Sequence, residues 1–283
     1  MIMLEPREGE LSLDNRPIGV FDSGMGGLTT VREMAKQLPN ESVVYFGDTG
    51  RVPYGGRSRD TILRYARQDV AFLRTFDLKA IVIACGTVSS TALAELSAEQ
   101  EIPVFGVVGP TALRAAQVTR NNKIGLIATK ATVRTGAYER VMRHANPMAE
   151  TFSLACPLFV PLVENGRTQP GDVVIETVVR DYLSPIRDAG VDTLVLGCTH
   201  YPLLTEVIQN FMGPEVTLLD SGAEVVRQVR ERLHASGHQA AENRRGTYRW
   251  FVSDTTESFT ELASRFLGRP VTEPVGQVAI ERY

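Results

Sequence analysis

Two cysteines lie in matching sequence contexts, and their thiols are suited to acid–base chemistry. Cys85 ends the segment Ile-Val-Ile-Ala-Cys and Cys198 ends Leu-Val-Leu-Gly-Cys, and a threonine follows each closely, at Thr87 and Thr199. A thiol at the start of a helix meets unpaired backbone N–H groups, which predicts a lowered cysteine pKa. Two such thiols on opposite sides of one carbon would remove a proton from one face and deliver a proton to the other. The pair therefore predicts inversion of a stereocentre, unless both thiols only fill a core.

The third cysteine, Cys156, has no such context. It follows Phe-Ser-Leu-Ala and precedes Pro157, so we interpret it as structural. Three widely spaced cysteines do not make a disulfide framework. This cysteine usage favours a reduced, cytoplasmic protein.

A glycine-rich segment, Asp22-Ser23-Gly24-Met25-Gly26-Gly27, follows the first apolar run and precedes a helical pattern. Glycines there allow backbone N–H groups to approach an anion at a helix start. A dinucleotide fingerprint would need glycine at position 29, which is Thr29, and a Walker A loop would need a Gly-Lys pair, which the chain lacks. The segment predicts either a turn that binds an anion or polar group, or an ordinary tight turn.

Two further groups of polar residues fall after apolar runs. Tyr54 and Gly55 lie in a loop that shapes either a ligand pocket or a simple turn. His200 follows Cys198 by two residues and could protonate the thiol or stabilise its thiolate, although a lone histidine often only makes hydrogen bonds. Zinc binding by Cys198 and His200 lacks a second pair of ligands. A pyridoxal phosphate site on Lys130 would leave the thiol pair unexplained.

The elements that position these residues follow an alternating pattern. Short, continuous apolar runs are typical of parallel strands buried on both faces, and stretches of helical period separate them. The predicted strands are residues 18–21, 43–46, 80–84, 104–108, 124–128, 193–196, 216–219 and 247–252. The predicted helices are residues 28–38, 61–76, 88–100, 133–144, 172–189, 223–234 and 257–267, with a loop at 234–245. The pattern predicts an α/β fold with right-handed crossovers.

The two cysteine segments lie about one domain length apart, which suggests two similar domains that each contribute one thiol. Ligands bind at the carboxyl ends of parallel strands, where both thiols would lie. We therefore predict two similar α/β domains with parallel sheets and an active site in the cleft between them. The expected division is residues 17–106 plus 218–283 for the first domain and 107–217 for the second, with residues 1–16 as a flexible leader.

Composition excludes other classes of protein. The 283 residues include 30 Lys plus Arg and 33 Asp plus Glu, a formal charge of −3, which argues against binding to nucleic acid. No apolar run approaches the ~18 residues of a membrane helix. The N-terminus has no hydrophobic stretch, so we expect no signal peptide.

Several segments together resemble the glutamate racemases of the aspartate/glutamate racemase superfamily. They are PIGVFDSGMGGLT, VVYFGDTGRVPYG, IVIACGT, VDTLVLGCTHYPLL and LLDSGAE, in this order along the chain. The resemblance implies two pseudo-symmetric α/β domains with the active site between them. It also implies interconversion of L- and D-glutamate in the cytoplasm without cofactor or metal, supplying D-glutamate for bacterial peptidoglycan, and an assembly as a homodimer.

The same resemblance implies roles for individual residues. Cys85 is expected to abstract the α-proton of D-glutamate and Cys198 that of L-glutamate, with Asp22 and His200 each assisting the thiol on its own side. The residues implied to line the substrate site are Asp22, Ser23, Tyr54, Gly55, Gly86, Thr87, Thr199 and His200.

One position departs from the family pattern. The family usually reads Ala-Cys-Asn-Thr, whereas this chain reads Ala-Cys-Gly-Thr, with Gly86 in place of asparagine. The lost side chain removes a hydrogen bond to a charged ligand, worth roughly 1.5–3 kcal/mol. Two alternatives therefore stay open: a racemase for aspartate or for several amino acids, and a catalytically weak protein that binds amino acids.

Overall fold

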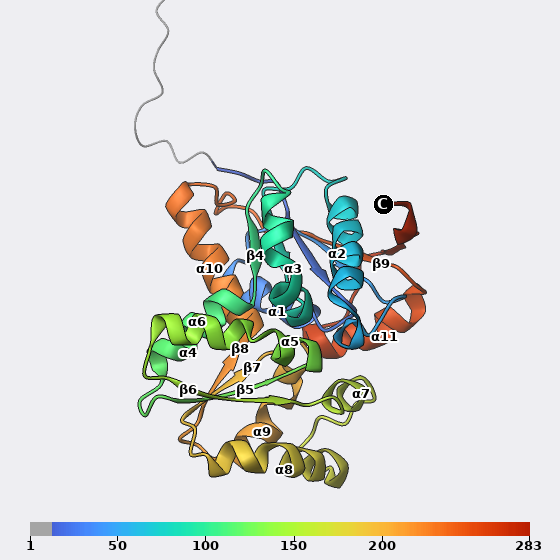
Figure 1. Ribbon diagram of the computed structural model, residues 1–283. Helices are drawn as coiled ribbons and strands as arrows, with labels where there is room; N and C mark the ends of the chain where they lie inside the picture. The colour runs from blue at the N-terminus through green and yellow to red at the C-terminus, as the bar shows by residue number, and fades with distance from the viewer. Residues whose placement is uncertain (1–12) are drawn as a thin grey trace, which may run out of the picture.

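The computed structural model describes residues 13–283, without the side chains of residues 258 and 261. The chain forms two parallel β-sheets, each with helices on both faces, one above the other in Figure 1. Every strand pair in both sheets is parallel. The predicted α/β fold is confirmed.

The first sheet has six strands in the order β10-β9-β2-β1-β3-β4. Its strands are β1 (Ile18–Asp22), β2 (Val43–Gly47), β3 (Ala80–Ile83), β4 (Val104–Gly106), β9 (Tyr248–Val252) and β10 (Val275–Gln277). All residues of β1, β2 and β3 are buried. Burial on both faces explains why these strands are continuously apolar in the sequence.

The second sheet has four strands in the order β6-β5-β7-β8. They are β5 (Lys123–Ala128), β6 (Glu150–Ala155), β7 (Thr193–Leu196) and β8 (Thr217–Asp220). This order repeats the order β2-β1-β3-β4 of the first sheet strand for strand. The prediction of two similar α/β halves is confirmed, since β3 and β7 occupy equivalent places in the two sheets.

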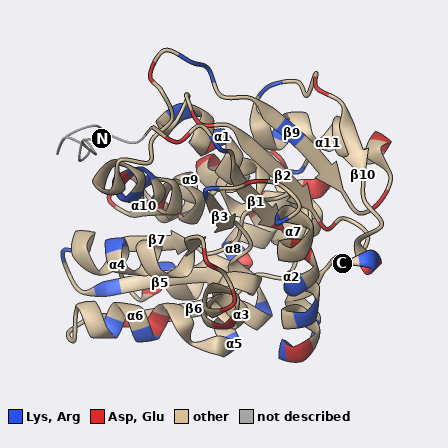
Figure 2. Cartoon of the chain, turned by 90° about the horizontal axis from the view of Figure 1, so that it is seen from above, with Lys and Arg blue, Asp and Glu red and all other residues tan. Residues whose placement is uncertain are grey.

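Eleven α-helices of the described residues connect and cover the strands. They are α1 (Leu28–Gln37), α2 (Arg59–Leu73), α3 (Gly86–Ala98), α4 (Val108–Val118), α5 (Lys130–Thr135), α6 (Ala137–Ala145), α7 (Phe159–Glu164), α8 (Val173–Asp188), α9 (Thr205–Met212), α10 (Ser221–Ser236) and α11 (Thr256–Leu267). Within residues 13–283 none of them has both the length and the apolar character to cross a membrane. Lysine, arginine, aspartate and glutamate are interspersed over the helices (Figure 2).

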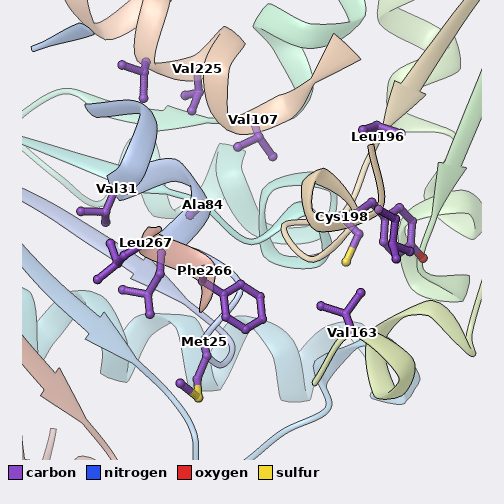
Figure 3. Close-up of a cluster of buried hydrophobic side chains, with 14 of the residues drawn as sticks. Met25, Val31, Ala84, Val107, Val163, Leu196, Cys198, Val225, Phe266 and Leu267 are labelled. Carbon is purple, nitrogen blue, oxygen red and sulfur yellow. The ribbon is translucent and has the colours of Figure 1, made fainter. Parts of the chain in front are cut away.

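The hydrophobic core is continuous across the two halves of the molecule. One cluster of buried side chains includes Met25 and Val31 near the first sheet, Leu196 and Cys198 near the second, and Phe266 of α11. Figure 3 shows these side chains converging, with the sulfur of Cys198 directed toward Val163. The halves therefore meet through packed apolar side chains next to one of the two candidate thiols.

Local chemistry accounts for where the predicted elements differ from the observed ones. The helix predicted over residues 133–144 is two helices, because Gly136 adopts a left-handed conformation (φ 61°) between α5 and α6. Strand β6 was not predicted. It is an edge strand whose residues are exposed or half-buried, so it lacks a continuous apolar run. Helices α4, α7 and α9 and strand β10 were also missed.

The boundary at which the chain returns from the second half to the first lies later in the sequence than predicted. Strand β8 pairs with β7 through Asp220, so the predicted boundary after residue 217 falls inside a strand. Most of the predicted leader, residues 1–12, lies outside the described residues. Asp14 is held to the first half, because its carbonyl accepts a hydrogen bond from Lys79 Nζ (2.7 Å) and its N–H donates to the Gln239 carbonyl (2.9 Å).

Candidate active site

A cleft of about 480 Å³ lies between the two halves, and both thiols line it. It opens where strands of both sheets end, as expected for ligand sites in parallel sheets. The predicted site residues that line it are Ser23, Tyr54, Gly55, Cys85, Gly86, Thr87, Cys198, Thr199 and His200. The structure thus brings together residues that are far apart in the sequence, and two thiols from equivalent strands face one space.

Cys85 is the residue immediately before α3 and is buried. Its Sγ–H donates a hydrogen bond to Ser23 Oγ at 3.2 Å. Burial and the charge of Asp22 together raise the pKa of Cys85 to about 12, against the opposing effect of hydrogen bonds with Ser23 and with the backbone of Val88. The prediction that the helix start lowers this pKa is wrong, because desolvation outweighs the nearby N–H groups.

Asp22 ends β1 and is buried, but it is not among the residues that line the cleft. Its Oδ2 accepts a hydrogen bond from the Gly24 N–H at 3.1 Å. Burial raises the pKa of Asp22, and the charge of His200 opposes that rise. Asp22 is therefore not part of the cleft lining that the resemblance implies, although its charge raises the pKa of Cys85.

The second thiol belongs to a chain of three polar side chains. Nδ1 of His200 lies 4.0 Å from Cys198 Sγ, and Nε2 of the same ring lies 2.9 Å from Glu164 Oε1. Burial lowers the pKa of His200, but contacts with Cys198 and Glu164 raise it more, to about 10. These contacts favour the protonated form of the ring, which lies between Cys198 and Glu164.

Glu164 was missed by the sequence reasoning. It is the last residue of α7, a short helix that was not predicted, and it lies on the cleft wall. Position 164 carries no local signal, because only the folded chain brings it to His200, 36 residues away.

The glycine-rich turn after β1 packs against the second half. Thr29 Oγ1 donates a hydrogen bond to the Thr199 carbonyl at 3.0 Å. A Cβ at Gly26 would overlap the side chains of Thr199 and His200. The turn thus allows the close approach of the two halves, while Ser23 and Gly24 of the same turn line the cleft.

Tyr54 lines the cleft, but its hydroxyl is engaged elsewhere. The hydroxyl donates to Asp48 and lies 3.2 Å from Asp69 Oδ2. Arg51 joins the same buried group, with Nε 2.7 Å from Asp48 and a terminal nitrogen 2.9 Å from Asp69. Burial, together with the charge of Asp48, raises the pKa of Asp69 well above its usual range. The cluster anchors the loop that carries Tyr54 and Gly55.

Other residues on the wall complete the cleft. Thr87 Oγ1 of the first half lies 3.0 Å from Thr129 Oγ1 of the second, so hydroxyl groups bridge the halves. Thr129 and Lys130 follow β5 and were not predicted to line the site. Cys156 also lines the cleft, and its carbonyl accepts a hydrogen bond from the Tyr201 hydroxyl at 3.0 Å. Burial raises the pKa of the Cys156 thiol, consistent with an inert side chain.

The Asp/Glu/Hydantoin racemase model matches residues 18–229, most of the chain and both cysteine segments. The chain belongs to this family. A glutamate racemase of Geobacter metallireducens is 47% identical over 266 residues, covering 94% of this chain and 97% of the relative. A glutamate racemase of Lactococcus lactis is 44% identical, covering 95% and 96%.

Solved structures of family members have the same fold. A glutamate racemase isoform of Bacillus anthracis superimposes with a TM-score of 0.89 at 37% identity, covering 94% of this chain and 98% of that one. A glutamate racemase of Francisella tularensis in complex with D-glutamate gives a TM-score of 0.86 at 36% identity, covering 96% and 100%. The predicted resemblance to glutamate racemases is confirmed.

Proposed function

We propose that this protein is a glutamate racemase that interconverts L- and D-glutamate through Cys85 and Cys198. The observation that carries the proposal is the placement of both thiols, from equivalent strands of two similar halves, on one cleft. A relative that shares 47% of residues over nearly the whole chain is a glutamate racemase. A structural relative was solved with D-glutamate.

The two thiols have different surroundings, and the resemblance to glutamate racemases assigns one enantiomer to each of them. Burial raises the pKa of Cys85 to about 12, which favours its thiol form before L-glutamate binds. The imidazolium of His200 beside Cys198 stabilises negative charge on that sulfur. With L-glutamate, the Cys198 thiolate takes the α-proton and the Cys85 thiol delivers its own proton to the opposite face. The reverse transfers convert D-glutamate, and no net proton is gained or lost.

The α-proton of an amino acid is weakly acidic, so the site must stabilise carbanion character. Backbone N–H groups at the start of α3 and the hydroxyls of Thr87 and Thr129 border the cleft. Such fixed dipoles stabilise developing charge without reorganising. We assign to them the binding of the substrate's carboxylates. The chain's own residues supply every proton transfer, so the proposed reaction uses neither cofactor nor metal.

The proposed setting follows from the activity. D-Glutamate is a precursor of bacterial peptidoglycan, so we place the protein in cell-wall synthesis in the cytoplasm. We also propose a homodimer, for which exposed apolar side chains such as Val173 and Leu158 offer contact surface. Sedimentation equilibrium tests the dimer directly.

Polarimetry tests the activity and the substrate. Purified protein is incubated separately with L-glutamate, D-glutamate and L-aspartate, with a chelator and no added cofactor. Loss of rotation from both glutamate enantiomers, and much slower loss from aspartate, is the expected result. Faster turnover of aspartate would identify an aspartate racemase, and binding of glutamate without turnover would identify a binding protein.

A further inference from the structure

The chain passes between the two halves of the molecule twice, and each passage is hydrogen-bonded to the element that carries one of the thiols. The first passage runs from β4 into α4, and the second runs from β8 into α10. Helix α10 packs against α1 of the first half, whereas α4 packs against β7 of the second half. A change in the separation of the halves therefore acts on the backbone at these two passages.

At the second passage, the hydroxyl of Ser221 holds the end of the strand that precedes Cys198. Ser221 is the first residue of α10 and is buried. Its Oγ–H donates a hydrogen bond to the carbonyl of Leu196, the last residue of β7, at 2.5 Å. The next residue, Gly197, donates its N–H to the Ile127 carbonyl of β5 at 2.8 Å. The backbone that presents this thiol is thus fixed by β5 on one side and by the start of α10 on the other.

At the first passage, Ser89 makes a comparable link to Cys85. Ser89 lies in the first turn of α3 and is buried, and its N–H donates to the Cys85 carbonyl at 2.9 Å. Its Oγ accepts a hydrogen bond from the N–H of Val108, the first residue of α4, at 3.3 Å. Gly106 ends β4, and a Cβ there would lie 2.4 Å from Ser89 Oγ. The passage therefore lies directly against this hydroxyl.

These two serines differ from a serine that serves only its own helix. The hydroxyl of Ser236, the last residue of α10, donates to the Arg232 carbonyl one turn earlier at 3.0 Å, a local pattern for serine in helices. Ser89 and Ser221 instead bond backbone groups outside their own helices. Neither is among the described residues that line the cleft, so any effect on the substrate must pass through the backbone that carries each thiol.

We propose that Ser221 and Ser89 are positioning residues that couple each thiol to a passage between the halves. Ser221 ties the end of β7, and with it Cys198, to α10. Ser89 ties the start of α3, and with it Cys85, to α4. A change in the separation of the halves thus moves each thiol together with its passage, which keeps both thiols aligned on one substrate carbon. This inference rests on the proposed racemase function.

Alkylation of the thiols by iodoacetamide tests the two links without relying on activity. The full chain of the parent, Ser221→Ala and Ser89→Ala is alkylated, and the rate at each cysteine is followed by mass spectrometry of its peptide. A buried thiol reacts only from a locally opened state, so its rate follows the stability of the bonds that hold it. Cys156 is the internal reference, because its carbonyl is bonded to the Tyr201 hydroxyl and to neither serine.

Each variant is expected to free the thiol on its own side. Ser221→Ala should raise the alkylation rate of Cys198 by about 2- to 12-fold, the equilibrium change that one ordinary hydrogen bond supplies. Ser89→Ala should raise the rate of Cys85 by a similar factor. In each variant the other two thiols should react as in the parent.

Ser236→Ala is the matched control, since it removes a serine hydroxyl that bonds only within α10, and all three of its thiols should react as in the parent. Equal acceleration of all three thiols in Ser221→Ala or Ser89→Ala, or no acceleration, would overturn the proposal. Failure of both variants to fold would also overturn it, because the proposal assigns to each serine one hydrogen bond and no share of a core.

A kinetic arm separates positioning from general loss of stability. Both variants are expected to lower kcat for L- and D-glutamate by roughly 10- to 100-fold, as misplacement of a reacting group does, with a smaller change in KM. An unchanged kcat in both variants would overturn the positioning role. A parent that fails to racemise glutamate would contradict the proposed function, while the pattern of alkylation would still decide whether each serine holds its thiol.

Discussion

Glu164 Oε1 lies 2.9 Å from Nε2 of His200, and this contact joins the end of α7 to the loop after β7. The other nitrogen of the ring faces Cys198 Sγ at 4.0 Å. A carboxylate on one side of an imidazole fixes the ring and favours its protonated form. Glu164 therefore raises the pH at which His200 loses its proton.

Glu164→Gln is expected to lower the pKa of His200 from about 10, because a carboxylate that raises that pKa is removed. The loss of activity at high pH should then begin at lower pH. We expect kcat to fall by roughly 100-fold, the low end of what a positioned acid–base group contributes. The pH dependence of kcat/KM from pH 6 to 10.5 measures both effects. Glu206→Gln, at an exposed position of α9, provides the control. Superimposable pH profiles for the parent and Glu164→Gln would contradict the role of Glu164.

The raised pKa of His200 also predicts a pH dependence of stability. The folded protein holds this proton up to pH about 10, whereas the ordinary pKa is 6.5. The contribution is therefore fully present below pH 6.5 and is lost as the pH rises through 10. Between these limits the free energy of unfolding of the parent should fall more steeply than that of His200→Asn. Urea unfolding at pH 6, 8 and 10 measures the difference. Parallel curves for the two proteins would show that His200 does not titrate as expected.

Tyr54→Phe is expected to destabilise the fold, because it removes the buried hydroxyl that donates to Asp48 and lies 3.2 Å from Asp69 Oδ2. A buried acceptor that loses its partner costs about 1–3 kcal/mol. Urea unfolding tests this value. Tyr65→Phe is the matched control, since Tyr65 packs against the Tyr54 ring with a centroid distance of 5.4 Å. Equal unfolding free energies for Tyr54→Phe and the parent would mean that the hydroxyl contributes nothing.

Much of the fold and of the site was predictable because its signals are local. A short apolar run ending in Cys85 or Cys198 defines a buried strand and the position just beyond it. The end of a parallel strand is where ligands bind, so both thiols were assigned to the cleft before their surroundings were known. Ser23 and Thr87 also follow strands closely, and the family resemblance implies that they line the site.

What the sequence did not predict depends on contacts between distant segments. Glu164 reaches the site because α7 packs near the loop of His200, and neither element encodes this in its own pattern. The pKa of Cys85 rises because the folded chain removes water from it, an effect that outweighs the local helix start. Strand β6 escaped detection because an edge strand needs no continuous apolar run.

The central claim is that each thiol serves one enantiomer, and hydrogen exchange in single-cysteine variants tests it most directly. Cys85→Ser and Cys198→Ser are each incubated with L-glutamate and with D-glutamate in deuterated water, and α-deuterium is measured by NMR. The account predicts no racemisation by either variant. It predicts deuterium in L-glutamate only with Cys85→Ser, which keeps Cys198, and in D-glutamate only with Cys198→Ser. Racemisation at the parent's rate by either variant, or exchange of both enantiomers by the same variant, would contradict the two-thiol account.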